Sequence, residues 1–556
     1  MAGTWSALTH QPTFNTSTMF LLTDGRIMVN EEATTHWHAL APDDSGSYVN
    51  GTWSELADMG IWRRYYASGM LKDGRLIIVG GEQNGDGVID TNKGEIYDPV
   101  ADTWTAIPTP PGWPLVGDAS SCILPDGRLM IGGLLDGRCI IYNPTTNAWT
   151  NAATKAIRAN EETWILQPDD TIIAPQCWSP FQSEKYVIAS DAWQNEGAPA
   201  ATLVDPVMNE IGAGMLCYTG RTIFFGSASV GGVGKTSVYS RGATATATGS
   251  WAAGPDIPTV GGQTMVCNDC PASLLPNGKV LVTGAQFLNN DWGNPIHFFE
   301  YNPATNTMAA VPDPSNNVKK LYWSRQMLLP TGQVMFSPST NNVQVYTPDG
   351  GPQEAWRPTI TAITPHTFGF FTSPDYYLLQ GTQLNGLSQA NTYGDDCQPG
   401  TNYPLIRMTD TSTHHVFYAR TYDFSTMGVA TGAALQSCRF KLFDIPYGNY
   451  DLCVIANGIS SHCQAFAHNR PNKPYFIDHG LKEVFEHYGK IVFEGDPFKW
   501  RDWVVDPVDV VRLKQQVKQL QNSVNRLNSL IGAKQLPRVG QEVANEASKE
   551  KPKHTE

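Results

Sequence analysis

The chain has 556 residues, which is too long for one compact core and predicts roughly two to four domains. Its formal net charge is -14, so it has no general attraction to phosphate backbones or anionic lipid, and we expect neither a nucleic-acid partner nor membrane insertion. The 51 Gly, 38 Pro and 10% aromatic residues are typical of a turn-rich, all-β protein.

The start of the chain, "MAGTWSALTHQPTFN", contains no basic segment followed by an apolar stretch. This stretch therefore predicts no secretory signal in the chain. The chain also lacks a run of about 18 apolar residues, so we expect no transmembrane helix. The composition is compatible with an extracellular or surface location.

A repeat runs through the first part of the chain: an apolar run, Asp-Gly-Arg or a relative, and a second apolar run. It is clearest in "FLLTDGRIMV" (20–29), "GMLKDGRLIIVGG" (69–81) and "CILPDGRLMIGG" (122–133). Weaker copies follow at 165–174, 215–226, 273–284 and 327–336. The spacing of about fifty residues is typical of kelch-type blades. Each copy predicts two strands joined by a hairpin in which Gly adopts a positive φ.

A second marker, Tyr followed by a Pro-containing turn and Trp, comes after most copies, as in "IYDPVADTW" (96–104). It predicts the third strand, a turn and the outer fourth strand of a blade. The last copy ends at "VYTPDG" (345–350) without an outer strand, and "GTWSAL" (3–8) can supply one. We therefore predict a seven-bladed kelch-type β-propeller over residues 1–352, closed by its N-terminal strand so that no edge stays open.

Four further regions follow the repeats. Residues 353–470 hold several short Pro-punctuated strands, which predict an Ig-like (E-set) β-sandwich. Residues 471–505 form a connector, and 533–556 are a polar tail that we expect to be disordered. Over 506–532 the apolar positions alternate in steps of three and four, which favours a coiled-coil helix and self-association. The alternative is an amphipathic helix packed on its own domain. The apolar positions are Val510, Leu513, Val517, Leu520, Val524, Leu527 and Ile531.

A kelch propeller followed by a β-sandwich resembles the galactose oxidase and glyoxal oxidase family, over about residues 1–468. "WRRYYASGMLKDGRLIIVGG" (62–81) is similar to the blade that supplies the family's cross-linked tyrosine. "LYWSRQMLLPTG" (321–332) is similar to the blade that supplies its axial tyrosine and a histidine. The resemblance implies a copper site made of a cysteine bonded to a tyrosine, a second tyrosine and two histidines.

Few of these ligands carry over to the present chain. Tyr65 or Tyr66 matches the cross-linked tyrosine and Tyr322 the axial one, but Trp323 stands where the first histidine belongs. An indole offers an N–H donor and no lone pair to a metal. The blade-one segment 12–25 has no cysteine, and the sandwich loop 422–437 has no histidine. Copper(II) needs imidazole-like donors, so we expect no cofactor and no copper–radical chemistry.

Two other motifs contain metal-ligating or redox-active side chains. His36 and His38 lie two apart, which suits either a metal site or a hydrogen-bonded surface pair. Cys267 and Cys270 form a C-x-x-C motif, which suits a redox pair, half of a metal site or a small disulfide. We favour a disulfide that clamps the loop, because no second C-x-x-C and no thioredoxin-like pattern accompany the motif.

The leading hypothesis is a non-enzymatic, multivalent binding protein with a lectin-like, adhesive or structural role. Its ligand would be a glycan or a protein held by aromatic and guanidinium groups, and self-association would multiply weak sites. The alternative is an oxidoreductase that makes hydrogen peroxide at a rearranged metal site, with His36 and His38 beside Tyr65 or Tyr322. Core packing of the same side chains is a third interpretation. The candidate ligand residues, expected to converge in a funnel at one end of the propeller, are Arg63, Arg64, Tyr65, Tyr66, Tyr322, Trp323 and Arg325.

Overall fold

The computed structural model describes residues 3–469 except 83–84, 86–89, 119, 289–290, 367–373, 375 and 394–398. The predicted connector, coiled coil and tail over 471–556 lie outside the described residues. The propeller and the strand-rich module after it belong to one compact unit, which contains Met1–His366, Tyr376–Lys441 and Gly448–Asn469. No helix within the described ranges is long and apolar enough to cross a membrane.

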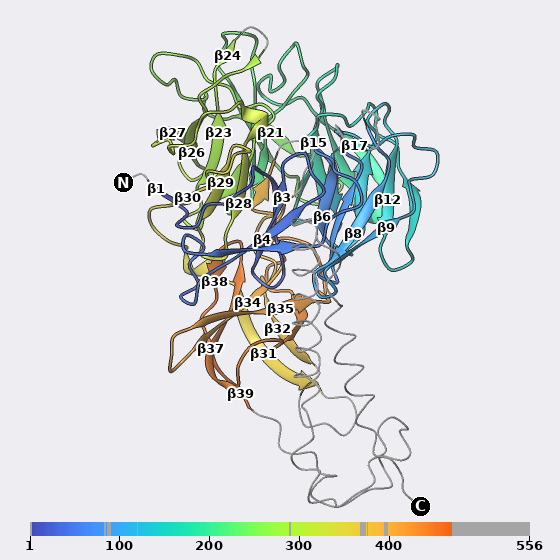
Figure 1. The fold of residues 1–556 in the computed structure, drawn as a ribbon. Helices are drawn as coiled ribbons and strands as arrows, with labels where there is room; N and C mark the ends of the chain where they lie inside the picture. Colours follow the sequence, from blue (N-terminus) through green and yellow to red (C-terminus); the bar gives the residue numbers. More distant parts are fainter. Residues whose placement is uncertain are drawn as a thin grey trace, which may run out of the picture. The chain divides into compact units, whose positions relative to one another are not determined.

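The protein is an all-β structure with a seven-bladed propeller, and its blades run from blue through green in Figure 1. Blade one contains β2 (Thr16–Leu21), β3 (Ile27–Glu31), β4 (Trp37–Ala41) and β5 (Thr52–Leu56). Blade two contains β6 (Ala67–Met70), β7 (Leu76–Val79), β8 (Gly94–Asp98) and β9 (Thr103–Ile107). Blade three contains β10 (Ser121–Ile123), β11 (Leu129–Gly132), β12 (Cys139–Asn143) and β13 (Ala148–Ala152). Blade four contains β14 (Ile165–Leu166), β15 (Thr171–Pro175), β16 (Ser183–Val187) and β17 (Ala192–Gly197).

The remaining blades follow the same antiparallel order. Blade five contains β18 (Gly214–Leu216), β19 (Thr222–Phe225), β20 (Thr236–Ser240) and β21 (Ser250–Ala253). Blade six contains β22 (Ala272–Leu274), β23 (Val280–Gly284), β26 (His297–Asn302) and β27 (Thr307–Val311), with a side hairpin of β24 (Phe287–Leu288) and β25 (Asp291–Trp292). Blade seven contains β28 (Arg325–Leu328), β29 (Val334–Ser337), β30 (Gln344–Thr347) and β1 (Thr4–Ala7). The antiparallel pairing of β1 with β30 places the N-terminal strand at the outer edge of this blade, where the sequence predicts it.

The Asp-Gly-Arg motif makes the hairpin between the two inner strands of a blade. In blade one the Leu22 N–H donates to the Arg26 carbonyl, and Gly25 has a φ of 81°. Asp24 accepts the Arg26 backbone N–H at 3.2 Å and its Nε–H at 2.9 Å. The Asp therefore fixes both the turn and the arginine that ends it, and the same pairs recur at 73–75 and 126–128.

The Trp of the Tyr–Trp marker connects several blades to the previous one. Tyr97 and Trp104 are cross-strand partners whose ring centroids lie 5.2 Å apart. The Trp104 indole N–H then donates to the Ala57 carbonyl of blade one at 3.0 Å. Trp5 of the closing strand does the same to the Pro312 carbonyl of blade six at 2.7 Å. At these junctions a large apolar ring with one polar edge covers the contact between blades and satisfies a loop carbonyl.

The second module is an antiparallel sheet coloured yellow to orange in Figure 1, with the strand order β31-β32-β36-β35-β34-β37-β38 and with β39 also paired to β37. A disulfide joins Cys453 to Cys463. The strands of this sheet are β31 (Thr359–His366), β32 (Tyr376–Thr382), β34 (Leu405–Asp410), β35 (Val416–Tyr422), β36 (Gln436–Lys441), β37 (Gly448–Ala456), β38 (Ile459–Ser460) and β39 (Gln464–His468). The helical elements among the described residues are the 3-10 turns Ile188–Ser190, Leu321–Trp323 and Glu354–Trp356.

One segment of this second module enters the propeller. The short strand β33 (Asn391–Thr392) pairs with β22, the inner strand of blade six. The Asn391 amide donates to the Gln326 carbonyl at 3.0 Å, and the Thr392 hydroxyl donates to the Gly214 carbonyl at 2.8 Å. These bonds tie the inserted segment to blades five, six and seven at their inner strands.

Candidate functional site

The two ends of the propeller follow from its up-and-down strand order. The Asp-Gly-Arg hairpins lie at one end, which we call the hairpin end. The loops between second and third strands, and the connections between blades, lie at the other, which we call the funnel end. Tyr418 and Val416 of β35 lie against the glycines at 25 and 46, so the second module packs at the hairpin end.

Arg325 lies among three tyrosines at the start of the inner strand of blade seven. Its guanidinium carbon lies 4.0 Å from the ring centroid of Tyr393 and 5.7 Å from that of Tyr65. Its Nη1 donates to the backbone carbonyls of Tyr322 and Ser324, at 2.7 and 2.8 Å. Arg325 is 5% exposed, so a permanent cation is held in a largely buried aromatic setting.

A second arginine, Arg64, stacks on an aromatic ring next to Arg325 and its tyrosines. The Arg64 guanidinium carbon lies 5.0 Å from the ring of Trp323 and forms an ion pair with Glu32 at the end of β3. The Lys319 ammonium lies 5.9 Å from the same Trp323 ring. Blades seven, one and two therefore meet through one cation–aromatic cluster. We define the funnel cluster as Glu32, Arg64, Tyr65, Tyr322, Trp323, Arg325 and Tyr393.

The backbone around Arg64 is well defined. Its N–H donates to the Glu82 carbonyl at 3.1 Å, and the Glu82 N–H donates back to the Arg64 carbonyl at 2.9 Å. Glu82 also bridges to Asp90, and burial together with repulsion from Glu82 raises the pKa of the Asp90 carboxyl. Carboxylates therefore border the cluster on the side of blade two.

Tyr65 adopts a left-handed backbone conformation with a φ of 49°. A bulky residue adopts this conformation only where the surrounding structure enforces it, and such residues gather at functional sites. The next residue begins the run into β6, so the turn at Tyr65 brings its ring to Arg325 and turns Tyr66 away. The strain supports a role for Tyr65 in the cluster.

Two of the predicted funnel residues lie elsewhere. Arg63 is 1% exposed, pairs with Glu95 of β8 and donates to the Lys93 carbonyl at 2.8 Å, all within blade two. Tyr66 is 1% exposed and lies 6.5 Å from the ring of Phe20 in blade one. The structure places both in the packing between strands, where each side chain is almost fully buried.

Tyr393 is a member of the cluster that the sequence analysis missed. It follows β33 directly, and its hydroxyl donates to the Tyr322 carbonyl at 2.6 Å. The second-module segment that reaches the inner strands is thus the one around β33, whereas residues 426 and 427 bond to the Pro125 carbonyl of a blade-three hairpin. The loop 422–437 was therefore the wrong segment to search for a ligand. The stretch 383–404 has no histidine either.

The two candidate histidines do not converge. His36 Nδ1 lies 2.8 Å from the Asp58 carboxylate and is exposed. His38 Nε2 lies 3.1 Å from Glu31, and its ring stacks on Phe14 at 3.7 Å. Across the described part of the chain, no group of three or more His, Cys, Asp or Glu side chains is arranged to hold a metal ion.

Copper does not fit the funnel cluster. The cluster offers phenols, an indole and two guanidinium groups, and guanidinium has no lone pair to donate. Arg325 lies against the ring of Tyr65, the residue that matches the family's cross-linked tyrosine. A fixed cation there opposes binding of a second cation, and imidazole donors are missing.

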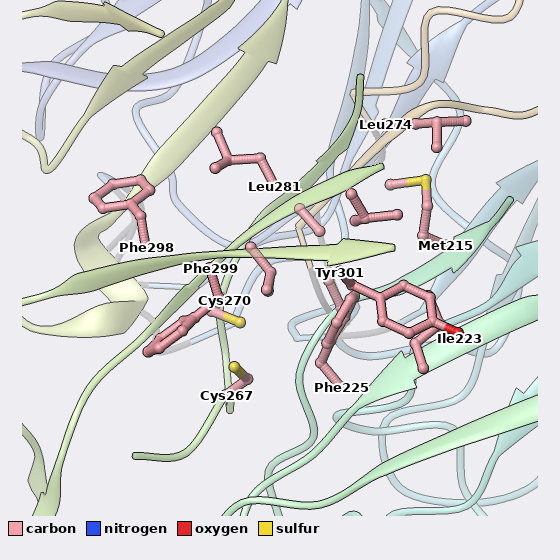
Figure 2. Close-up of a cluster of buried hydrophobic side chains, with 14 of the residues drawn as sticks. Met215, Ile223, Phe225, Cys267, Cys270, Leu274, Leu281, Phe298, Phe299 and Tyr301 are labelled. Atoms are coloured by element: carbon pink, nitrogen blue, oxygen red, sulfur yellow. The ribbon is translucent and has the colours of Figure 1, made fainter. Parts of the chain in front are cut away.

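Cys267 and Cys270 are free thiols, in contrast to the expected disulfide. Figure 2 shows their sulfur atoms pointing toward one another among the buried side chains of blades five and six, which include Phe225 and Phe299. Burial is the main cause that raises the pKa of the Cys267 thiol, and its hydrogen bond with Cys270 adds to the shift. Cys453–Cys463 is the bridge that the described residues contain.

Comparisons with known proteins agree with this fold. The model of the Kelch motif matches residues 63–111. The Kelch-like protein terF of Aspergillus terreus is 30% identical over 115 residues, which are 18% of this chain and 25% of that protein. Galactose oxidase of Gibberella zeae is 30% identical over 124 residues, 22% of this chain and 17% of that enzyme. The chain thus aligns with a quarter or less of each relative's length.

Among solved structures, the chain resembles a fungal alcohol oxidase of the AA5 family, solved in complex with copper. The TM-score is 0.50 at 14% identity, and the match covers 84% of this chain and 99% of that one. At this identity the likeness concerns the fold alone. Together with the seven sheets, these findings support a galactose oxidase-like kelch propeller as the class of this protein.

Proposed function

We propose that this protein is a non-enzymatic binding protein that uses the funnel cluster as its ligand surface. The observation that carries the proposal is the position of Arg325, whose guanidinium lies over Tyr65 and Tyr393. At about 6 Å and an effective dielectric constant of about 20, a guanidinium and a divalent ion repel by about 5 kcal/mol. The scaffold of an oxidase is thus combined with a centre that disfavours a metal ion.

The cluster suits recognition by stacking and by hydrogen bonds. Tyr322 and Trp323 are half-buried, so part of each residue reaches the surface. The Glu32–Arg64 pair beside them offers both acceptors and N–H donors. Aromatic faces with adjacent polar groups are typical of surfaces that bind sugar rings or protein segments. The ligand is accordingly a carbohydrate or a protein partner.

The proposal retains two predictions from the sequence. The first is that the strand-rich module, residues 353–470, is an Ig-like β-sandwich. The second is that residues 506–532 associate between copies of the chain. Linked copies would bind a repetitive ligand with an avidity well above the affinity of a single site.

A binding screen with a matched control tests the proposal. Wild type, Trp323→Ala and Trp178→Ala are compared on an array of immobilised glycans and in pull-downs from the source organism. Trp178 is the control because Arg158 stacks on it at 3.7 Å at the same end of blade four, outside the cluster. We expect wild type and Trp178→Ala to bind one ligand class and Trp323→Ala to lose it. A ligand retained by Trp323→Ala would contradict the proposal.

A further inference from the structure

A cleft of about 410 Å³ lies at the hairpin end of the propeller, away from the funnel cluster. Its walls are the inner hairpins of blades two and three, the turn between β12 and β13, and strands β32 and β36 of the second module. The residues that carry the argument are Lys72, Arg128, Thr145, Asp423, Ser437 and Arg439.

The cations of the cleft differ in whether they have a carboxylate partner. Arg128 and Arg439 are held by Asp126 at 2.7 Å and by Asp423 at 3.0 Å, and each pair is part exposed. Lys72 has no carboxylate partner among the residues that the structure describes, although it lines the cleft beside these pairs. A lysine ammonium in a partly enclosed site without a counter-ion favours an anionic ligand.

The face of the sheet next to the cleft also carries cationic side chains. Tyr422 is the cross-strand partner of Arg439, and Arg420 is the partner of Lys441, so these side chains share one face. The Arg439 guanidinium carbon lies 4.6 Å from the ring of Tyr376, and that of Arg420 lies 5.1 Å from the ring of Tyr422. Stacking fixes the plane of each guanidinium, so less freedom is lost when its N–H groups bind a ligand.

The charges of the whole region can be compared directly. The cleft is lined by three cations, Lys72, Arg128 and Arg439, and by three carboxylates, Asp73, Asp126 and Asp423, and the adjoining sheet face adds Arg420 and Lys441. Asp73 is itself paired with Arg75 at 2.6 Å. Cations therefore exceed carboxylates here, within a chain whose net charge is -14.

We propose that the cleft and the adjoining sheet face bind an acidic oligosaccharide that carries carboxylate or sulfate groups. Lys72 and the guanidinium edges would receive the charged groups, and the Thr145 and Ser437 hydroxyls would bond sugar hydroxyls. A nucleic acid is disfavoured, because the chain as a whole is acidic, with a net charge of -14. This site is separate from the funnel cluster and goes beyond its proposed ligand.

The test is a titration with defined saccharides at low salt. Oligogalacturonate, sulfated dextran and uncharged dextran of equal length are added to wild type, to the double variant Lys72→Gln/Arg439→Gln and to the control Arg138→Gln. Arg138 is matched to Arg439, because it pairs with Asp136 at 2.9 Å and stacks on Trp113 at 5.5 Å. We expect an acidic saccharide to bind wild type and the control at least about tenfold more tightly than the double variant.

A second measurement needs no variant and so does not depend on whether one folds. Acetylation of lysines is mapped by mass spectrometry with and without the saccharide that binds. We expect protection of Lys72 but not of Lys235, which is exposed and paired with Asp256 in blade five. If only oligogalacturonate binds, the acidic group of the ligand is a carboxylate; if only sulfated dextran binds, it is a sulfate. Absence of binding, an unprotected Lys72, or equal binding of single-stranded DNA would overturn the proposal.

Discussion

The two ends of the propeller differ in whether the same side chains recur from blade to blade. At the hairpin end, Asp24–Arg26, Asp73–Arg75 and Asp126–Arg128 form the same pair in successive blades. At the funnel end, the residues before the inner strands differ from blade to blade, and Arg64, Tyr65 and Trp323 have no equivalents in their neighbours. The repeated end specifies the fold, and the unrepeated end carries the side chains from which we infer a function.

The largest expected effect is a difference in stability between variants of two adjacent arginines at the funnel end. Arg63→Met removes the buried partner of Glu95, which is 8% exposed, and should destabilise the fold by about 3–5 kcal/mol. Arg64→Met removes the partner of Glu32 from a pair whose side chains are 14% and 11% exposed, so water still reaches both groups and the loss should be smaller, about 1–2 kcal/mol. Urea unfolding of both variants checks the difference. Equal losses would mean that both arginines serve the packing, and Arg64 would lose its place in the proposed site.

The closing strand provides the next test, since it belongs to the repeated part of the structure. Trp5 packs on Phe298, Phe336 and Tyr346, so Trp5→Ala should lower the free energy of unfolding by about 3 kcal/mol. Ligand binding at the funnel end should stay within about twofold. A decrease in the free energy of unfolding below about 1 kcal/mol would show that the stability of the seven-bladed propeller does not depend on the N-terminal strand.

Glu162, in the blade connection before β14, gives a pH-dependent test. It is fully buried 3.2 Å from Lys155, and burial raises the pKa of its carboxyl to about 7. A raised pKa in the folded state means that stability is highest at low pH. This contribution, on the order of 3 kcal/mol, should be lost as the pH rises from about 4.5 through 7. Unfolding measured across that range should show the loss in wild type and little of it in Glu162→Gln. Matching slopes for the two proteins would contradict the assignment.

The smallest effect concerns the segment that the second module inserts. Tyr393→Phe removes one hydrogen bond, to the Tyr322 carbonyl, and keeps the ring on Arg325. We expect a loss of about 1 kcal/mol in unfolding and a change of only a fewfold in ligand affinity. Tyr393→Ala also removes the stacked ring and should weaken binding more. Tyr393 is 1% exposed, so it would act by holding Arg325 in place rather than by touching the ligand, and equal binding by both variants would exclude this positioning role.

The sequence predicts the repeated parts of this molecule well, because their determinants are local. An Asp-Gly-Arg hairpin or a Tyr–Trp pair is complete within about ten residues, so its structure can be inferred without knowledge of the fold. Tyr65, Trp323 and Arg325 could be proposed from the family resemblance, since their neighbours match known blades. The different partners of Arg63 and Arg64 could not, because Glu95 and Glu32 reach them from strands that are distant in the sequence.

Long-range partners were also beyond prediction. Tyr393 reaches Arg325 from a different module, and no local pattern around "QANTYGDD" marks it as part of the site. Cys453 and Cys463 form the disulfide although the shorter C-x-x-C spacing of Cys267 and Cys270 looked more favourable. In both cases the outcome depends on which strands pair, and strand pairing across modules leaves no periodic signal in the sequence.

The most direct test of the account is the metal content of the full chain after loading with copper and desalting, measured by mass spectrometry together with peroxide release. Arg325 at Tyr65, and Trp323 in the place of a histidine, predict far less than one copper per chain and no peroxide. Near-stoichiometric copper that is lost in Tyr65→Phe and Tyr322→Phe would contradict the binding-protein account and would establish a metal site in the funnel cluster.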